Sequence, residues 1–455
     1  MAKRNKAASL PQASIADSVA FATQVALPTW SKGLIVRRPG AVALAERARL
    51  DERAVRQMQA LRRKYGDGPL LLRLPVRNQA IVLGTEHVRR VLDESPEPFA
   101  TASSEKRAAL SHFEPKNALV SQGAKRAERR QFNERALEAE RPVHRQTGHF
   151  ARIVAEEAER LMANVAPAGE LGWDDFVASW GRIVRRVIFG DGAADDTALS
   201  DMMTSLRSRA NWAFLAPKDR TMRARFHQRV QDHLDRAESG SLAETIARTP
   251  QEPETAPSHQ VAQWLFAFGP AGMATARALV LLASHRAAEA RARDEAADRA
   301  ATEKLDLPFL RATILESLRL WPTTPAVLRQ TTRDTQWDAG TMPAGTGVFI
   351  YAPFFHRDDE NLPFAHRFEP DIWLNPQRQG DWPLIPFSGG PAICPARNLV
   401  PTVGSLMLAE LLSASGFELV QPDTLHPDHP LPGTLDNFAL RFRLRETASP
   451  RDATG

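Results

Sequence analysis

Residues 381–400 read DWPLIPFSGGPAICPARNLV and contain the only cysteine of the chain, Cys394. Gly389-Gly390-Pro391 predicts a tight turn just before the cysteine, and the apolar run from Leu399 to Leu412 predicts a helix just after it. A thiolate near a helix N-terminus is stabilised by the helix dipole and by free backbone N–H groups. The stretch therefore predicts a loop that presents one sulfur atom, with Phe387 packed over the turn.

A single cysteine limits the kinds of site that the chain can build. It excludes an intrachain disulfide, so the sequence gives no sign of an oxidising compartment. Zinc needs four protein ligands, or three plus water, and no His lies close to Cys394 in the sequence. A lone thiolate suits haem iron, because the macrocycle supplies four nitrogens. Two interpretations stay open from these residues alone, a haem-ligating thiolate and an inert buried cysteine in a Pro/Gly loop.

A second informative stretch, residues 305–322, reads LDLPFLRATILESLRLWP and predicts a helix with Asp306 as its N-cap. Glu316 and Arg319 lie three residues apart and therefore share a helix face close to the apolar stripe. An exposed pair of this kind contributes only about 0.3 kcal/mol, whereas a buried pair needs further partners to offset desolvation. Arg367, in an aromatic-flanked loop, is the predicted third member of this cluster.

Composition places the chain among ordinary globular proteins. It has 455 residues, of which 43% are hydrophobic and 25% charged, which excludes a disordered chain, a collagen-like chain and a disulfide-stapled miniprotein. Lys+Arg 59 against Asp+Glu 54 gives 59 − 54 = +5. This excess is small for the length. It permits an acidic partner without requiring nucleic acid, and we expect no nucleic-acid partner.

The longest apolar stretch, Val261 to Ser284, has the length of a membrane span. Arg277 lies inside it, however, and a central Arg costs about 3 kcal/mol on insertion scales. Gly269-Pro270 also interrupts it. We therefore expect a long buried helix with an irregular turn and no membrane span. Because the basic start of the chain lacks the apolar core of a signal peptide, we expect a soluble cytoplasmic protein.

Helical patterns dominate the chain, and strand signals are few and short. We expect a mainly α protein with small β-sheets, folded as one large domain over residues 31–446. Residues 1–30 and 447–455 are expected to be poorly ordered tails. The expected helices are 46–63, 86–92, 123–139, 147–164, 173–189, 196–215, 221–248 and 261–300, and the expected strands are 69–74, 79–84, 347–351 and 438–444.

Three features in this order resemble the cytochrome P450 family of haem-thiolate monooxygenases. Glu316-Ser317-Leu318-Arg319 matches the family's ExxR motif, and Arg367 in the AHRF stretch resembles the Arg of its meander motif. The family's haem loop is matched by Phe387, Gly390 and Cys394. The resemblance covers about residues 40–446, and its specificity comes from the set of motifs rather than from any one of them.

The resemblance implies a haem b held by the Cys394 thiolate, and a P450 fold. It also implies cofactor contacts from Arg126, Arg130 and Arg329 to the haem propionates. Ala271-Gly272-Met273-Ala274-Thr275 resembles the oxygen-binding kink of the family's central helix, with Thr275 as its hydroxyl group. Ala396 stands where the family usually has Gly, against the haem.

The implied reaction inserts one oxygen atom from O2 into an apolar organic small molecule. Electrons would come from separate proteins, a ferredoxin and a ferredoxin reductase or their equivalent, because one cysteine cannot hold an iron–sulfur cluster. The basic run Lys125 to Arg130 is either part of the docking surface for this carrier or a solvated helix face. We expect a monomer. The residues expected in the substrate pocket are Trp264, Phe268 and Val327, although plain core packing explains Trp264 and Phe268 equally well.

Several positions depart from the family pattern. Ala274 replaces the acid that usually precedes the threonine, so the usual proton relay is missing. Pro395 lacks an N–H, and we therefore expect fewer hydrogen bonds to the sulfur than usual. The missing acid keeps a hydrogen-peroxide-dependent peroxygenase open, although such enzymes typically carry Arg-Pro where this chain has Gly269-Pro270. A non-catalytic haem-binding protein is the other alternative, against which Thr275 and the apolar pocket argue.

Overall fold

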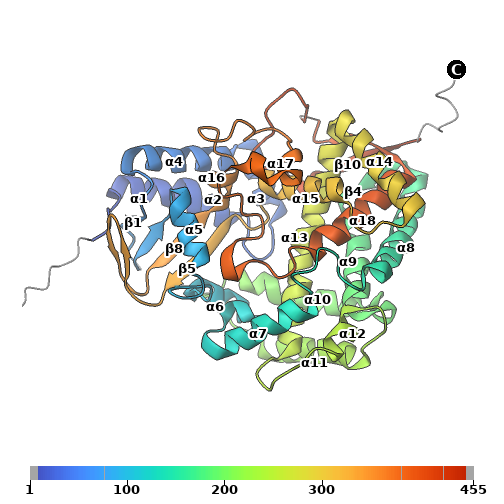
Figure 1. Cartoon of the computed structure of the whole chain (residues 1–455), viewed down its shortest axis with the longest axis horizontal. Helices are drawn as coiled ribbons and strands as arrows, with labels where there is room; N and C mark the ends of the chain where they lie inside the picture. The colour runs from blue at the N-terminus through green and yellow to red at the C-terminus, as the bar shows by residue number, and fades with distance from the viewer. Residues whose placement is uncertain (1–8, 76, 381, 424, 447–455) are drawn as a thin grey trace, which may run out of the picture.

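The computed structural model describes residues 9–75, 77–380, 382–423 and 425–446 (Figure 1). The larger part of the molecule is helical, and its core is built from α7 to α15 and α18. The smaller part holds a five-stranded sheet, which is covered by α1, α4 and α5. The helices are α1 (Ile15–Phe21), η1 (Ala22–Ala26), α2 (Leu27–Ser31), α3 (Pro39–Arg47), α4 (Leu50–Tyr65), α5 (Thr85–Asp93), α6 (Ser104–Leu110), α7 (Gly123–Ala136), α8 (Thr147–Val165), α9 (Trp173–Phe189), α10 (Thr197–Ala210), α11 (Arg220–Arg236), α12 (Leu242–Ala247), α13 (Pro257–Ser284), α14 (Arg286–Thr302), α15 (Pro308–Leu320), α16 (Ala352–His356), α17 (Asp371–Leu374) and α18 (Leu399–Ala414).

The sheets join segments that are far apart in the sequence. The five-stranded sheet has the order β1-β2-β8-β5-β3, and only the β2–β8 pair is parallel. A three-stranded sheet has the order β4-β10-β9, and β6 and β7 form a hairpin. The strands are β1 (Leu70–Leu72), β2 (Gln79–Ile81), β3 (Phe99–Ala100), β4 (Glu170–Gly172), β5 (Ala326–Thr331), β6 (Thr335–Trp337), β7 (Gly340–Met342), β8 (Gly347–Tyr351), β9 (Gly416–Gln421) and β10 (Arg441–Arg445).

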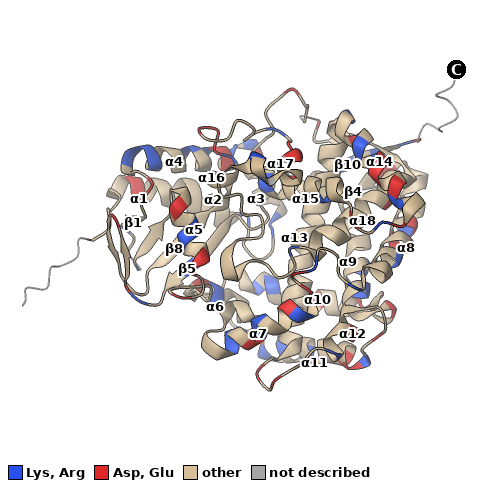
Figure 2. Ribbon diagram, in the orientation of Figure 1, with Lys and Arg blue, Asp and Glu red and all other residues tan. Residues whose placement is uncertain are grey.

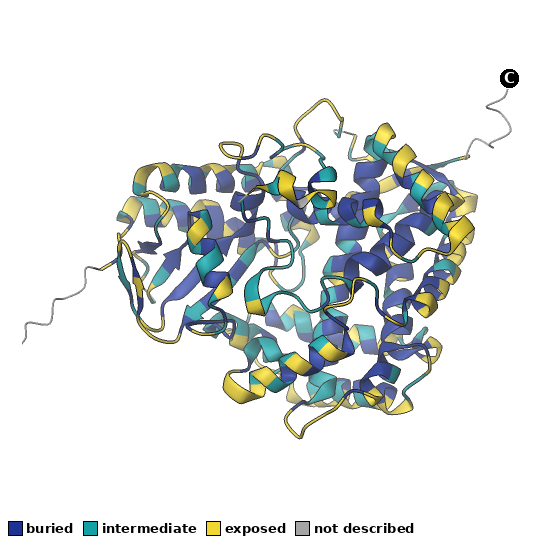
Figure 3. Cartoon of the chain, viewed as in Figure 1, coloured by how far each residue is buried: buried dark blue, intermediate teal, exposed yellow. Residues whose placement is uncertain are grey.

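The mainly helical fold class is confirmed, and so are most of the expected elements. The central apolar helix α13 runs without a break through Pro270, so the expected irregular turn is absent from it. Among the described helices, α13 alone is long and apolar enough to span a membrane, and 67% of its most apolar window is buried inside the molecule. Figure 3 shows α13 and α18 as mostly buried helices. α13 is therefore packed as a core helix.

The expectation of a poorly ordered N-terminal tail is wrong from Ser9 onward, and residues 1–8 lie outside the described range. The side chain of Ser14 accepts a hydrogen bond from Asp17 N and so begins α1. Phe21 is buried and makes an edge-to-face contact with Phe349 of β8, with ring centroids 5.4 Å apart. The N-terminal helices therefore form part of the hydrophobic core around the sheet. The second expected tail, 447–455, also lies outside the described residues.

Candidate functional site

The loop before Cys394 is held by backbone hydrogen bonds. Cys394 N donates to Phe387 O at 3.0 Å, and Ile393 N donates to Gly390 O at 3.0 Å. Gly390 has φ +60°, and a Cβ at this position would lie 2.2 Å from Leu92 O at the end of α5. Only glycine fits both the backbone angle and the close approach. The predicted tight turn is therefore present, and α5 fixes its position.

The sulfur of Cys394 precedes α18 by a four-residue turn rather than lying at the helix N-terminus. The N–H of Ala396 donates to the sulfur, which supplies a hydrogen bond that Pro395 cannot make. Burial is nevertheless the largest effect, and it raises the pKa of the thiol. The chain by itself therefore holds a protonated sulfur, and a metal would have to displace that proton.

A group of cationic side chains faces the same loop. Arg329 of β5 is 3% exposed and donates to Ser95 Oγ at 2.8 Å and to Ser388 Oγ at 3.2 Å. Burial and the nearby charge of Arg126 lower its pKa to about 10. Burial, with Arg329 as the next cause, lowers the pKa of Lys106 on α6 to about 7. We call Lys106, Arg126 and Arg329 the cation cluster.

The cation cluster lacks negative partners. Lys106 Nζ donates to Leu328 O at 3.1 Å, and among the described residues none of the three cations forms an ion pair with a carboxylate. Arg329 is buried and Lys106 and Arg126 are half-buried, and like charges in such a setting repel one another unless an anion is bound between them. Three elements, α6, α7 and β5, thus converge on a position that suits a dianionic group beside the sulfur.

Arg130 has a different role from the expected propionate contact. Its Nη1 donates to Ile393 O at 2.6 Å, and its Nε pairs with Glu134 Oε1 at 2.6 Å. It therefore ties α7 to the residue that precedes Cys394. Its neighbour Arg129 is 5% exposed and donates to Ser121 Oγ and to Glu254, so it is neither a solvated nor a docking residue.

The Glu316 and Arg319 side chains are both fully buried and form two hydrogen bonds, at 2.6 and 2.8 Å. Arg319 also donates to four backbone carbonyls, those of His356, Phe364, Ala365 and Arg367. Glu316 accepts from Glu369 N at 2.8 Å and from Trp373 Nε1 at 2.9 Å. The buried pair is thus fully hydrogen-bonded, as its burial requires.

Arg367 joins this cluster through its carbonyl oxygen, while its side chain is exposed. The expectation of a Glu316/Arg319/Arg367 side-chain triad is therefore wrong. The third side chain is Trp373, six residues later, and no spacing in the sequence indicated it. The expected N-cap is also corrected, because Glu295 of α14 accepts from Phe309 N and Leu310 N at the start of α15.

Thr275 lies on a buried face of α13. Its hydroxyl donates to Ala271 O at 3.0 Å, and a Cβ on Gly404 of α18 would lie 2.6 Å from Thr275 Oγ1. The hydroxyl is therefore enclosed between α13, α15 and α18. The expectation that it faces a ligand beside Cys394 is corrected by this packing. Gly272 contacts Trp180, and Ala274 O accepts from Ser317 Oγ at 2.9 Å.

The expected pocket residues are also core residues. Trp264 is 4% exposed, and its Nε1 donates to Asn133 Oδ1 of α7 at 2.6 Å. Phe268 is 1% exposed, and its carbonyl accepts from Trp180 Nε1 at 2.7 Å. Val327 pairs with Ile350 within the sheet. The accessible face of α13 is the opposite one, formed by Gln263, Phe266, Ala267, Gly269, Pro270 and Met273.

These features fit an iron porphyrin. The half-buried Cys394 offers one sulfur ligand, Ala396 and Phe387 border it, and the cation cluster offers counter-charges for two propionates. The described residues contain no group of three or more His, Cys, Asp or Glu side chains that could hold a bare metal ion. A macrocycle that brings its own nitrogens matches a site with a single protein ligand.

Comparison with known proteins agrees with this geometry. Residues 269–435 match the family model described as Cytochrome P450. Over this region the chain is similar to the cytochrome P450 family. The whole chain has the fold of two solved structures, a retinoic acid-bound cyanobacterial CYP120A1 and a cytochrome P450, CYP102L1. The TM-scores are 0.68 and 0.70, at 17% and 19% identity, covering 86% and 97% of this chain and 94% and 100% of theirs.

Two curated relatives are similar over part of the chain. The chain is 32% identical over 206 residues to cyclooctat-9-en-7-ol 5-monooxygenase of Streptomyces melanosporofaciens, which is 42% of this chain and 44% of the relative. It is 32% identical over 183 residues to probable cytochrome P450 4s3 of Drosophila melanogaster, which is 40% of this chain and 36% of the relative. Both matches span less than half of the relatives' length.

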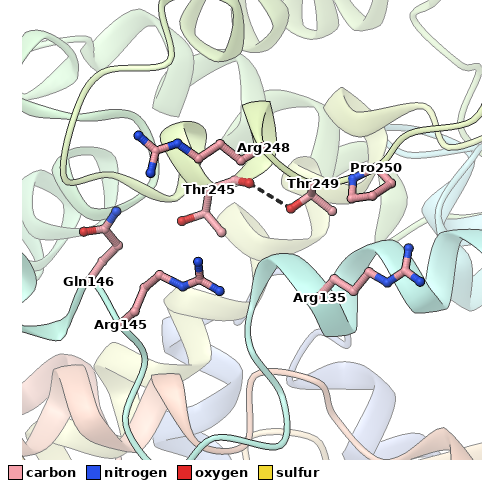
Figure 4. Close-up of a pocket in the computed structure, with 7 residues that line it drawn as sticks. All are labelled: Arg135, Arg145, Gln146, Thr245, Arg248, Thr249 and Pro250. Atoms are coloured by element: carbon pink, nitrogen blue, oxygen red, sulfur yellow. Dashed lines mark hydrogen bonds between the residues drawn. The ribbon is translucent and has the colours of Figure 1, made fainter.

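A separate surface hollow of about 250 Å³ lies away from Cys394 (Figure 4). It is lined by Arg135, Arg145 and Arg248 together with Gln146 and Thr245. Glu138 pairs with Arg145, and Glu244 pairs with Arg248 at 2.6 Å, so the positive charge is partly neutralised. Figure 2 shows the same mixing of acidic and basic residues over this side of the molecule.

Proposed function

We propose that this protein is a haem-thiolate monooxygenase that inserts one oxygen atom from O2 into an organic small molecule. The observation that carries the proposal is the placement of Cys394 beside the cation cluster, which lacks carboxylate partners among the described residues. The family match over residues 269–435 includes Cys394 and supports the same reading. Several relatives are also named as monooxygenases.

The cofactor proposed is haem b. Bound to a thiolate, haem iron supplies the oxygen chemistry, which the protein side chains do not perform. Cys394 would hold it from one side, Ala396 N–H would keep a hydrogen bond to the sulfur, and Arg130 would fix the loop. Lys106, Arg126 and Arg329 would pair with the propionates. The accessible face of α13 would border the substrate, and most of its side chains are apolar.

The proposal is tested by reconstituting the purified chain with haem and recording the spectrum of its ferrous carbon monoxide complex. We expect the red-shifted Soret band of a thiolate-ligated haem. Cys394→Ser should lose this band, whereas Ala392→Ser, which places the same side chain two residues away, should keep it. A wild-type spectrum without the band would contradict the proposal.

Electrons are proposed to come from a ferredoxin and its reductase. The basic run of α7 gives this little support, because Lys125 pairs with Glu254 at 3.1 Å and Arg129 and Arg130 are used internally. The enclosed hydroxyl of Thr275 and the alanine at position 274 favour a second candidate, a peroxide-dependent peroxygenase. Turnover with O2 and a ferredoxin system, compared with turnover on hydrogen peroxide alone, distinguishes the two. A cytoplasmic location and a monomeric state stay predictions.

A further inference from the structure

A buried carboxyl group lies against the accessible face of α13. Glu114 lies four residues after the end of α6 and is fully buried, next to Phe113. The Gln263 amide of α13, oriented with its nitrogen toward Glu114, donates to a Glu114 oxygen. Burial raises the pKa of Glu114 well above its ordinary value, and Arg207 is the nearby charge that opposes this shift. Burial therefore favours the neutral form of Glu114, in which the carboxyl group can donate its O–H.

Arg207 reaches the same face of α13 from α10. Its Cζ lies 4.6 Å from the ring centre of Phe266, and its Nη2 donates to Ile35 O at 2.9 Å. A Cβ on Gly269 would lie 3.8 Å from Arg207 Nη1. The Nε of Arg207 is buried and has no hydrogen-bond partner. The Nε–H of Arg207 is thus free to donate a hydrogen bond to a bound ligand.

The two groups approach α13 from different elements, and both meet its accessible face. The rings of Phe113 and Phe266 are in contact, with centroids 5.8 Å apart, so the segment that carries Glu114 packs on the same part of α13 as Arg207. Among the described residues, neither Glu114 nor Arg207 forms an ion pair with the other or with a third residue. Burial lowers the pKa of Arg207 to about 10, so it stays positive at neutral pH.

We propose that Arg207 and Glu114 bind the carboxylate of the substrate, which makes the preferred substrate an otherwise apolar carboxylic acid. The inference rests on the proposed function and names its substrate class. The carboxylate would accept from the free Nε–H of Arg207 and from the O–H of Glu114, while Phe266 and Phe113 would contact the adjacent hydrocarbon. A neutral ester would leave the Arg207 donors unpaired and would therefore bind more weakly.

The test uses the haem-reconstituted chain and the change of its Soret band on ligand binding. The probes are dodecanoic acid and 4-hexylbenzoic acid, each compared with its methyl ester. We expect at least one acid to bind at least tenfold more tightly than its ester. Arg207→Gln should reduce this preference at least tenfold, and Arg207→Lys, which keeps the charge, should retain part of it.

Arg209→Gln is the matched control, because Arg209 lies on the same helix, is half-buried and pairs with Asp219 at 3.8 Å. It should keep the preference for the acid. Equal binding of acid and ester, binding of neither acid, or a preference that survives Arg207→Gln would each overturn the inference. The carbon monoxide spectrum of every variant is recorded first. Loss of the thiolate band in the wild type would defeat the proposed function instead, which keeps the two failures distinct.

Discussion

At the scale of single residues, the sequence predicted the groups whose roles follow from residue type and missed those that depend on burial. The sequence contains one cysteine, and the glycine at position 390 meets a backbone oxygen that no other residue could approach. Lys106 and Glu114, by contrast, look like ordinary surface residues in the sequence. Only the packing of α6 against β5 and α13 removes their water and changes their protonation.

Lys106 predicts a pH-dependent step in cofactor loading. Its pKa is lowered from 10.5 to about 7 in the chain by itself, so it is mostly neutral between about pH 7 and 10. A bound anion favours the protonated form of Lys106, so in this pH range haem binding is coupled to the uptake of a proton by Lys106. The contribution of Lys106 to haem affinity therefore falls as pH rises.

Coordination of the Cys394 sulfur to iron would release the thiol proton, which is opposite in sign to the proton uptake by Lys106. Calorimetry at about pH 8 in buffers of different ionisation enthalpy should therefore show more net proton release for Lys106→Gln than for the wild type. The difference should approach about one proton. Lys125→Gln, an exposed residue paired with Glu254, should match the wild type. Equal proton release by all three proteins would contradict the assigned role.

Gly390 permits a matched comparison of backbone strain. Gly390→Ala should misplace the Cys394 loop, because the new Cβ would lie 2.2 Å from Leu92 O. Gly380→Ala has nearly the same φ, +59°, but meets nothing within 4 Å, so it should cost only about 1–2 kcal/mol in unfolding free energy. Haem retention and thermal unfolding measure both. Similar behaviour of the two variants would show that the close contact is unimportant.

At the scale of elements, helix positions follow from periodicity, but helix ends often do not. α9 has the predicted bounds, because its apolar face is regular and Gly190 follows its last residue. The expected helix over 221–248 is instead α11 and α12, which are separated at Ala237, a residue in the left-handed region with φ +45°. The signal lies three residues later, where Gly240 has φ +79° and Ser241 caps α12, so Ser239-Gly240-Ser241 indicates a turn that the prediction missed. The partner of Glu316, Trp373, was missed for a different reason, because the one-turn helix α17 that carries it has no sequence signal of its own.

The packing around α15 predicts unequal roles for Trp373 of α17 and for Arg367 in the loop before it. Trp373→Phe removes a hydrogen bond to the buried Glu316 carboxylate and should lower the unfolding free energy by about 1.5–3 kcal/mol. Arg367→Ala keeps the carbonyl that Arg319 uses and should change it by no more than about 0.5 kcal/mol. Denaturant titration measures both. A larger loss of unfolding free energy in Arg367→Ala than in Trp373→Phe would support the side-chain triad of Glu316, Arg319 and Arg367 after all.

At the scale of the whole molecule, two hydrophobic cores meet at the Cys394 loop. Phe387 and Cys394 pack against the helical core, while Ile385 belongs to the core around the sheet. The sequence predicted one large domain but not the contribution of residues 9–30. Their pattern is weakly periodic, and their helices are stabilised mainly by contacts with β1, β8 and α4 that are distant in sequence.

Phe21 tests this contribution. Phe21→Ala should lower the unfolding free energy by about 3–5 kcal/mol, because it removes a buried ring that packs on Phe349. Val19→Ala, two residues away and 55% exposed, should change it by no more than about 0.5 kcal/mol. Thermal unfolding of the haem-loaded chain measures both. Equal effects would mean that the N-terminal helices do not stabilise the domain.

The raised pKa of the Cys394 thiol also bears on how newly made chains survive before they acquire a cofactor. Peroxide and electrophiles attack the thiolate, and the thiol reacts far more slowly. Before haem binds, the protonated sulfur of Cys394 is therefore protected from irreversible oxidation. The same burial that disfavours the thiolate thus keeps this sulfur able to bind iron when the cofactor arrives.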